Sequence, residues 1–214
     1  MVINEMIHIP DGSAIIEGML EVPENAQGIV LFAHGSGSSR LSPRNNYVAK
    51  VLRQAGIGTL LMDLLTLQED QTYETRFDIA LLTRRLRVAT TWLQSEPRVK
   101  KLPLGYFGAS TGAAAALQAA VKMGASVSAV VSRGGRPDMA GAQALRQVVA
   151  PTLLLVGGHD DIVIELNQAA YDVMCCEKEF SIIPGATHLF EEPGTLEEVA
   201  RQASTWFKQH LKTV

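Results

Sequence analysis

The sequence has few cysteines and no long apolar run. Its only two cysteines, Cys175 and Cys176, are neighbours. A disulfide between adjacent residues is strained, and two thiols alone cannot hold a zinc ion. We therefore expect free, buried or half-buried thiols and a cytoplasmic location. The continuous apolar stretch of a membrane span and the basic start of a secretory signal are also absent, so neither a membrane partner nor a targeting segment is expected.

The sequence also lacks an excess of charge of either sign. Nineteen Lys and Arg residues stand against 22 Asp and Glu residues, which gives a net charge of -3. This balance, without a basic tail, predicts that nucleic acid is not a partner. The apolar share of 47% excludes disorder and predicts a sizeable core. A length of 214 residues fits one domain, which we place at residues 1–214.

Short apolar runs alternate with amphipathic segments along most of the chain. The first two runs flank the turn-rich Pro-Asp-Gly-Ser at 10–13 and predict an antiparallel hairpin. The later alternation predicts a mostly parallel sheet covered by helices, an α/β fold class. The eight expected strands are at residues 6–9, 15–20, 29–33, 58–62, 104–107, 129–131, 152–156 and 180–183.

Two helical stripes of apolar residues stand out between and after the strands. Leu82, Leu86, Ala89 and Leu93 form one stripe, and the segment 196–207 forms the last helix. Arginines at positions 84, 85 and 87 lie among the residues of the first stripe. We interpret them as a solvated helix face, with an anion site as the alternative.

The most informative motif lies at residues 106–112, Tyr-Phe-Gly-Ala-Ser-Thr-Gly. An apolar strand runs there into G-x-S-x-G and then into an alanine-rich helix, the context of a nucleophile elbow. A serine on such a sharp turn has strained backbone angles, and side chains in place of Gly108 and Gly112 would collide with the strand and helix. Ser110 is therefore the candidate nucleophile. A simple glycine-rich turn is the alternative.

A serine hydroxyl needs a base, and His188 is the candidate. It follows the last predicted strand and lies downstream of Ser110. The alternative is an ordinary surface histidine. We expect His34 to hold its own loop by a hydrogen bond, without touching substrate. Of the remaining histidines, His8 lies in the first hairpin, His159 follows a strand, and His210 lies near the end of the last helix.

The base in turn needs an acid, expected after another strand and between nucleophile and base in the chain. The segment Val-Gly-Gly-His-Asp-Asp at 156–161 contains two candidates, Asp160 and Asp161. We favour Asp160, because Asp161 is expected to cap a helix that begins near Ile162. Asp63, which follows the strand at 58–62, is a third candidate.

Two backbone N–H groups are needed to stabilise the oxyanion of a tetrahedral intermediate. We assign Thr111, which follows the nucleophile, and Ser36, in the loop His-Gly-Ser-Gly-Ser-Ser at 34–39. The Gly-Ser composition of this loop would also suit a phosphate cradle, but neither G-x-x-x-x-G-K-[ST] nor a complete G-x-G-x-x-G is present. Nucleotide binding is therefore the weaker interpretation, and we expect no metal and no cofactor.

Over essentially its whole length the sequence resembles the dienelactone-hydrolase-like branch of the α/β-hydrolase superfamily. The resemblance implies an eight-stranded sheet with the second strand antiparallel, and hydrolysis through a covalent acyl-enzyme. It also implies Ser110 as nucleophile, His188 as base and Asp160 as acid. The residues that carry the resemblance are His34, Gly35, the motif at 108–112, Gly157 to Asp160 and His188.

One position departs from that family pattern. Typical dienelactone hydrolases carry cysteine as the nucleophile, whereas this chain has Ser110. The departure favours a general esterase over a dienelactone substrate. The segments 39–45 and 132–138 resemble more closely those bacterial members that are sometimes fused to phosphoribosyltransferase domains.

Two arginines occur in loops beside the candidate site. Arg40 follows the oxyanion loop and Arg133 follows the sixth strand, near the sheet edge where ligands bind in open α/β folds. A guanidinium suits a carboxylate or phosphate. We hypothesise that they orient an anionic group of the substrate. The alternative is that each pairs with a structural acid such as Asp138, Glu165 or Glu191.

The sequence thus predicts a serine hydrolase that cleaves ester, lactone or thioester bonds of a small molecule. Residues 132–150 have room for one short helix at most, which predicts a shallow site without a large cap. Two alternatives remain open. One is an acyltransferase, and the other is a catalytically idle binding or regulatory domain with the same fold. Oligomeric state is not encoded in any pattern found here.

Overall fold

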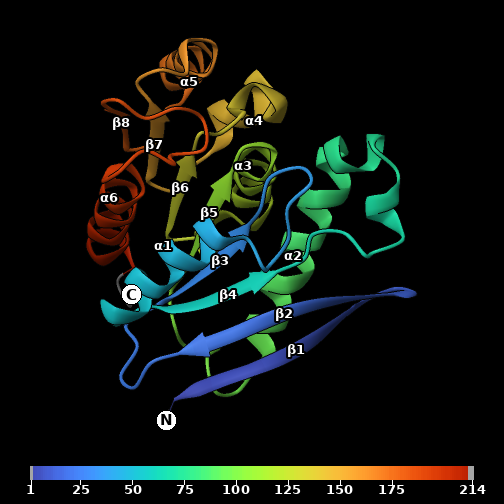
Figure 1. Ribbon diagram of the computed structural model, residues 1–214. Helices are drawn as coiled ribbons and strands as arrows, with labels where there is room; N and C mark the ends of the chain where they lie inside the picture. Colours follow the sequence, from blue (N-terminus) through green and yellow to red (C-terminus); the bar gives the residue numbers. More distant parts are fainter. Residues whose placement is uncertain (1, 212–214) are drawn as a thin grey trace.

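The computed structural model, which describes residues 2–211, is built around one eight-stranded sheet (Figure 1). The strands are β1 (Ile3–Asp11), β2 (Ala14–Val22), β3 (Ile29–Ala33), β4 (Gly58–Met62), β5 (Leu104–Ala109), β6 (Ala129–Arg133), β7 (Thr152–Gly157) and β8 (Lys178–Ile183). Their order is β1-β2-β4-β3-β5-β6-β7-β8. β2 is antiparallel to both β1 and β4, and the pairs from β4 to β8 are parallel. The predicted α/β-hydrolase fold is therefore confirmed.

The central strands are apolar along their whole length. Every residue of β3 to β7 is buried, because helices cover both faces of this part of the sheet. Buried residues alternate with exposed or half-buried ones along β1, and with mostly half-buried ones along β2. β5, β6 and β7 each run one or two residues further than expected, to Ala109, Arg133 and Gly157, so that they end directly at the predicted site loops.

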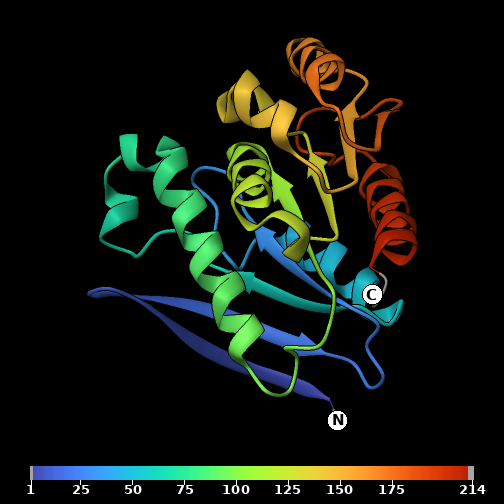
Figure 2. The same cartoon turned by 180° about the vertical axis from the view of Figure 1, so that it is seen from behind.

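Six α-helices cover the sheet: α1 (Pro43–Gln54), α2 (Ile79–Ser95), α3 (Thr111–Met123), α4 (Ala142–Gln147), α5 (Asp161–Val173) and α6 (Thr195–His210). Residues of α1 and α6 pack into one apolar cluster, and residues of α2, α3, α4 and α5 into the other. Figures 1 and 2 show the two faces in turn, with α1 and α6 in front in the first and α2 and α3 in front in the second.

Two segments add short 3-10 helices to this framework. Residues 63–78 contain η1 (Glu69–Gln71) and η2 (Glu74–Phe77), and the segment from 134 to 151 contains η4 (Pro137–Ala140) beside the six-residue α4. A further turn, η3 (Gly124–Ser126), follows α3. Neither segment forms a large helical cap within residues 2–211, but residues 132–150, expected to contain one short helix at most, contain two, η4 and α4.

Arg84 and Arg87 of α2 are exposed, as expected for a solvated helix face, but Arg85 is not. Arg85 is 1% exposed, and its two terminal nitrogens donate to Asp11 (Nη1–Oδ2, 2.5 Å) and Glu69 (Nη2–Oε1, 2.6 Å). The half-exposed Arg84 donates to the other oxygen of Asp11. The prediction is wrong for Arg85 alone, because its carboxylate partners come from β1 and η1, which are distant in the chain.

The two cysteines are free, and Cys175 is exposed while Cys176 is half-buried. The expectation that both would be at least half-buried is therefore wrong for Cys175, which follows the end of α5. None of the helices between residues 2 and 211 has the length and apolarity needed to cross a membrane.

Candidate active site

Ser110 occupies a strained turn between β5 and α3. Its backbone angles, φ 50° and ψ -122°, are ones that residues with a side chain rarely adopt. A Cβ at Gly108 would lie 2.5 Å from the Cα of Ala113, and one at Gly112 would lie 2.3 Å from the Ala33 carbonyl oxygen. Both glycines are thus required by the close approach of backbone on either side of the serine.

The end of β6 holds this turn in place. The Ser110 N–H donates to the Arg133 carbonyl (3.2 Å), and the Arg136 N–H donates to the Ser110 carbonyl (3.1 Å). The turn also places Ser110 at the N-cap position of α3, where Thr111 is the first helical residue. The first N–H groups of a helix have no carbonyl partner in the preceding turn, so they are available to a negatively charged oxygen.

His188 and Asp160 are brought into direct contact from two different loops. His188 Nδ1 lies 2.6 Å from Asp160 Oδ2. Because a carboxylate only accepts hydrogen bonds, Nδ1 carries a proton in this contact, and Nε2 of the neutral ring is left as an acceptor. The side chain of His188 is 39% exposed and that of Asp160 is 16% exposed. The ring is therefore oriented by a largely enclosed carboxylate and remains accessible.

The two other candidate acids have different positions. Asp161 begins α5, one residue earlier than expected, and is exposed. Asp161 is therefore not the N-cap of α5. Asp160 occupies that position, but its side chain forms no cap hydrogen bond. Asp63 accepts from the backbone N–H of Arg40 (Oδ1, 2.7 Å) and pairs with the Arg40 guanidinium. Asp160 is thus the candidate that reaches His188.

The loop that carries His188 is held by residues that sequence reasoning missed. Thr187 donates to the Glu192 carboxylate from its N–H (3.1 Å) and its hydroxyl (2.6 Å), and these bonds lower the pKa of Glu192. Phe190 is 1% exposed and has φ 56°. Gly134, beside Ser110, packs on this loop: a Cβ there would lie 3.3 Å from the His188 carbonyl oxygen.

Neither anchor of this loop had a clear signal in the sequence. An acidic residue five positions after a threonine is common, and an apolar residue two positions after a histidine carries no information on its backbone angles. The bonds between Thr187 and Glu192 lie within the loop itself. The packing of Gly134 on the loop is tertiary, because the ends of β6 and β8 meet at the same edge of the sheet.

The oxyanion loop lies against the serine turn. A Cβ at Gly35 would be 3.0 Å from Ser110 Cβ, so the absence of a side chain permits the approach. Ser36 and Thr111 line the same small cavity, of about 10 Å³. The two residues assigned to the oxyanion hole are therefore brought together.

His34 holds this loop in place, as expected from the sequence. Nδ1 donates to the Gly35 carbonyl (2.9 Å), and Nε2 accepts from the Leu64 N–H (2.9 Å). Only the neutral ring with its proton on Nδ1 can make both bonds. Burial lowers the pKa of His34, which favours that form.

The two candidate arginines differ in their partners. Arg40 Nη2 bonds Glu17 (2.6 Å), and its Nη1 bonds Asp63, so both ends of its guanidinium are occupied. Arg40 lines a groove of about 750 Å³ whose walls include neither Ser110 nor His188. Arg133, by contrast, is 7% exposed, and its Nε and Nη1 have no hydrogen-bond partner within residues 2–211.

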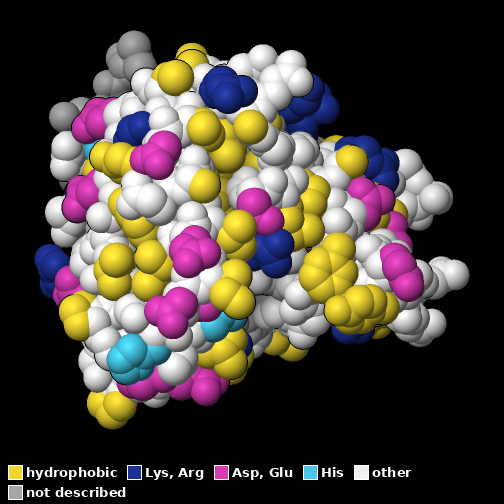
Figure 3. Space-filling view, turned by 90° about the horizontal axis from the view of Figure 1, so that it is seen from above, with side chains coloured by type: hydrophobic (Ala, Val, Ile, Leu, Met, Phe, Trp, Pro, Cys, Tyr) yellow, Lys and Arg dark blue, Asp and Glu magenta, His cyan; other side chains and the backbone are white. Residues whose placement is uncertain are grey.

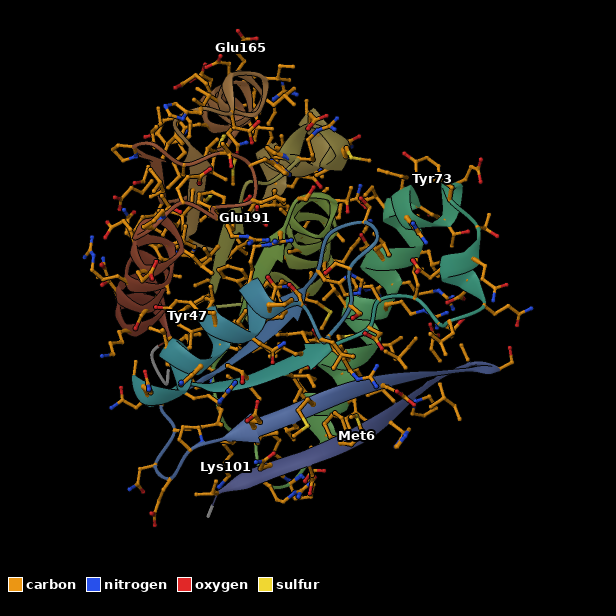
Figure 4. The ribbon with its side chains drawn as sticks, viewed as in Figure 1. Met6, Tyr47, Tyr73, Lys101, Glu165 and Glu191 are labelled. Atoms are coloured by element: carbon orange, nitrogen blue, oxygen red, sulfur yellow. The ribbon has the colours of Figure 1, made fainter. Side chains whose placement is uncertain are left out.

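The acids proposed as alternative partners of Arg133 are placed elsewhere. Asp138 binds Arg136 through both oxygens, at 2.9 and 2.7 Å. Glu191 accepts from Arg44, and Glu165 is exposed on the outer side of α5 (Figure 4). Among the residues described, no three or more His, Cys, Asp or Glu side chains are grouped so as to hold a metal ion.

A family model described as "Dienelactone hydrolase family" matches residues 16–213 of the chain. A crystal structure of a dienelactone hydrolase from Anabaena variabilis superposes with a TM-score of 0.96 at 53% identity, covering 99% of each chain. An esterase domain from a Rhodothermus marinus protein shares the fold with a TM-score of 0.78 at 18% identity, covering 98% of this chain and 99% of that one.

Two curated relatives from Mycobacterium tuberculosis have a different name. Both are called "Putative phosphoribosyl transferase" and are 56% identical over 208 residues, which is 97% of this chain and 47% of theirs. The chain thus spans about half the length of the curated relatives it matches.

Proposed function

Because the chain belongs to the dienelactone hydrolase family, we propose that it is a serine hydrolase that cleaves ester, lactone or thioester bonds of a small molecule. Ser110 is the nucleophile, His188 the base and Asp160 the acid that orients the base. The observation that carries this proposal is the 2.6 Å contact of His188 with Asp160, in a loop that packs on the end of β6 beside the Ser110 turn.

The first half of the reaction acylates Ser110. Its Oγ attacks the carbonyl carbon while the hydroxyl proton passes to His188 Nε2. The carbonyl oxygen becomes an oxyanion that accepts hydrogen bonds from the N–H groups of Ser36 and Thr111. When the carbonyl re-forms, the bond to the leaving oxygen or sulfur breaks and His188 returns the proton to the leaving group.

The second half releases the acid. Water attacks the acyl-enzyme carbonyl and gives a proton to His188, a second oxyanion forms in the same position, and its collapse breaks the bond to Ser110 Oγ, which takes the proton back. Asp160 accepts from His188 Nδ1–H throughout, which keeps Nε2 directed at the reacting atoms and stabilises the protonated ring. No metal or cofactor takes part in these steps.

A fluorophosphonate probe tests the nucleophile. We expect it to label the native protein and to fail with the denatured protein, with Ser110→Ala and with His188→Ala. Ser126→Ala, which removes an exposed serine distant in the chain from the site, is the matched control and should label normally. Labelling that survives in Ser110→Ala would overturn the assignment, and a native protein that does not label would favour a binding domain.

A substrate panel tests the reaction. Hydrolysis of p-nitrophenyl esters, lactones and acyl thioesters should fall by about 10³-fold or more in Ser110→Ala, since removal of the nucleophile leaves only binding and the oxyanion hole. Adding alcohol or amine acceptors to the same assay separates hydrolysis from acyl transfer. Release of the free acid alone supports the hydrolase, and preferential transfer to an acceptor supports the acyltransferase.

The phosphoribosyl transferase name does not displace this proposal. It is the name of proteins about twice as long, of which this chain matches 47%. This chain has a hydrolase family match along nearly all its length. We therefore assign ester hydrolysis to this chain and leave phosphoribosyl transfer to the other half of those relatives.

A further inference from the structure

Arg133 carries a buried charge without a partner. The residue ends β6 and is 7% exposed, and its Nε and Nη1 atoms are enclosed with no hydrogen-bond partner among the residues described. A buried cation is normally paired, because removal from water costs several kcal/mol that only a counter-charge and hydrogen bonds offset. Arg133 lacks this compensation within residues 2–211.

The surroundings of Arg133 add to this cost instead of relieving it. Burial, and then the charge of the neighbouring Arg44, lower the pKa of Arg133 to about 10. The Phe190 ring lies below the guanidinium, with its centroid 5.8 Å from Cζ, and such a contact offers weak attraction only. An uncompensated positive charge therefore remains at this point.

Arg44 is itself only partly satisfied. Its Nη1 donates to Glu191 (3.0 Å), but its Nε is buried without a hydrogen-bond partner in the described part of the chain. Glu191 is 64% exposed and lies above the N-terminal end of α1 (Figure 4). Only Arg44 bonds this solvated carboxylate, so the two arginines and Glu191 together have a net charge of about +1.

This cluster adjoins the candidate active site. The Arg133 carbonyl accepts from the Ser110 N–H, and the next residue, Gly134, packs on His188. Phe190, which lies below the guanidinium, is two residues after His188. The cluster is therefore tied to both the nucleophile turn and the loop of the base.

We propose that Arg133, with Arg44, binds an anionic group of the substrate, a carboxylate or a phosphate. The proposal rests on the proposed hydrolase function only for the identity of the molecule that carries the anion. Nε and Nη1 of Arg133 lie on different edges of the guanidinium, and Nη2, which is not among its enclosed atoms, completes either edge as a pair of donors that suits two oxygens of one anion. The face seen from above has acidic, basic and apolar side chains interspersed (Figure 3).

A binding experiment tests the proposal without relying on catalysis. Ser110→Ala protein is titrated with inorganic phosphate and, separately, with succinate, each against chloride at equal ionic strength, and its Tm is followed. We expect one or both anions to raise the Tm in a saturable manner and Arg133→Met to abolish the rise. The more effective anion identifies the group.

Arg136→Met is the matched control for that experiment. Arg136 lies in the same loop and is an arginine of equal charge, but it is 40% exposed and already paired with Asp138. It should retain the anion response. A Tm rise of equal size in Arg133→Met, or none with either anion in the parent protein, would overturn the proposal whatever the enzyme assays show.

Kinetics then connect the subsite to the substrate. The ratio of kcat/KM for mono-p-nitrophenyl succinate to that for p-nitrophenyl acetate should fall by about 10- to 100-fold in Arg133→Met, the loss expected for one charge-assisted pair. The ratio should stay unchanged in Arg136→Met. An equal fall for both esters would remove the anion role. If neither ester is hydrolysed, the hydrolase proposal fails while the binding experiment still decides this one.

Discussion

Arg85 and Arg133 are both buried arginines, but they lie in regions of the molecule that treat the same charge in opposite ways. At the antiparallel edge, Arg85 donates to Asp11 of β1 and Glu69 of η1 and so joins three elements. At the end of β6, Arg133 has an aromatic ring and a second arginine as neighbours. The two side chains are buried to a similar degree, but only the charge of Arg85 is compensated by carboxylates.

The difference separates a structural charge from one held ready for a ligand. A buried ion pair has little net effect on stability while both partners are present, but removal of one partner strongly destabilises the fold. A buried charge without a partner is a standing cost in the free protein, and such local inconsistencies concentrate at functional sites. The two arginines therefore predict opposite responses to the same substitution.

The largest effect is expected at Arg85. Arg85→Met should lower the free energy of unfolding by about 3–5 kcal/mol, because Asp11, which is 9% exposed, loses its buried counter-charge. Urea denaturation measures this. Arg84→Met is the control: Arg84 also bonds Asp11 but is 52% exposed, so the loss should stay below about 1 kcal/mol. Equal losses in both variants would contradict the distinction.

Arg133 should respond with the opposite sign. Its pKa in the folded protein, about 10, is below the ordinary value of 12.5, so the unfolded chain holds the proton more tightly and the charge costs stability at every pH below 10. Arg133→Met should therefore raise the free energy of unfolding by about 1–3 kcal/mol at pH 7 without phosphate or carboxylate buffers. Destabilisation instead would identify Arg133 as a structural residue.

His34 extends the comparison to a buried base that is satisfied only when neutral. Burial lowers its folded pKa below 6.5, so the unfolded chain takes up the proton first as the pH falls. We expect this residue to remove about 1–2 kcal/mol of stability between pH 7 and pH 5, and His34→Gln to abolish that part of the pH dependence. The measurement is urea denaturation across this range.

The exposed His8 is the control for His34. Its side chain is 60% exposed in the first hairpin, so His8→Gln should retain the acid sensitivity of the parent protein. If the two variants show the same pH profile, the buried ring of His34 is not its source.

The smallest effect is expected at Arg40. Arg40→Met should cost about 1 kcal/mol, because its partners Asp63 and Glu17 are partly solvated and Asp63 keeps its bond to the backbone N–H of residue 40. The Tm response to phosphate or succinate should remain. If this response is lost in Arg40→Met, the anion site includes the oxyanion-loop side of the molecule.

The alternation of apolar runs was sufficient to predict all eight strands, because buried parallel strands between two helix layers must be apolar throughout. The turn at Ser110 was also predictable, since a strand that enters G-x-S-x-G has few alternatives. Order along the chain placed His188 and Asp160 after neighbouring strands, and their 2.6 Å contact agrees with that order. These predictions combine local sequence patterns with one rule of topology, that the carboxyl ends of parallel strands lie at the same edge of the sheet.

Pairing between distant side chains was not predictable in the same way. Arg85 stood in a helix stripe that resembled a solvated face, and its partners are 16 and 74 residues away. Phe190 and Glu192 have no pattern that marks them as supports of the His188 loop. The contact of Phe190 with Arg133 depends on which elements meet in space, whereas Glu192 bonds Thr187 of its own loop.

The sequence by itself determined the sheet, the helices and the residue types at the ends of the strands, because periodicity and turn chemistry act over a few residues. Only the tertiary structure decided which charges are compensated. The sequence predicts both Arg40 and Arg133 to follow a strand beside the candidate site, yet Arg40 meets two carboxylates and Arg133 meets none within residues 2–211. Electrostatic compensation depends on distances of a few ångströms between segments remote in the chain, and folding alone sets those distances.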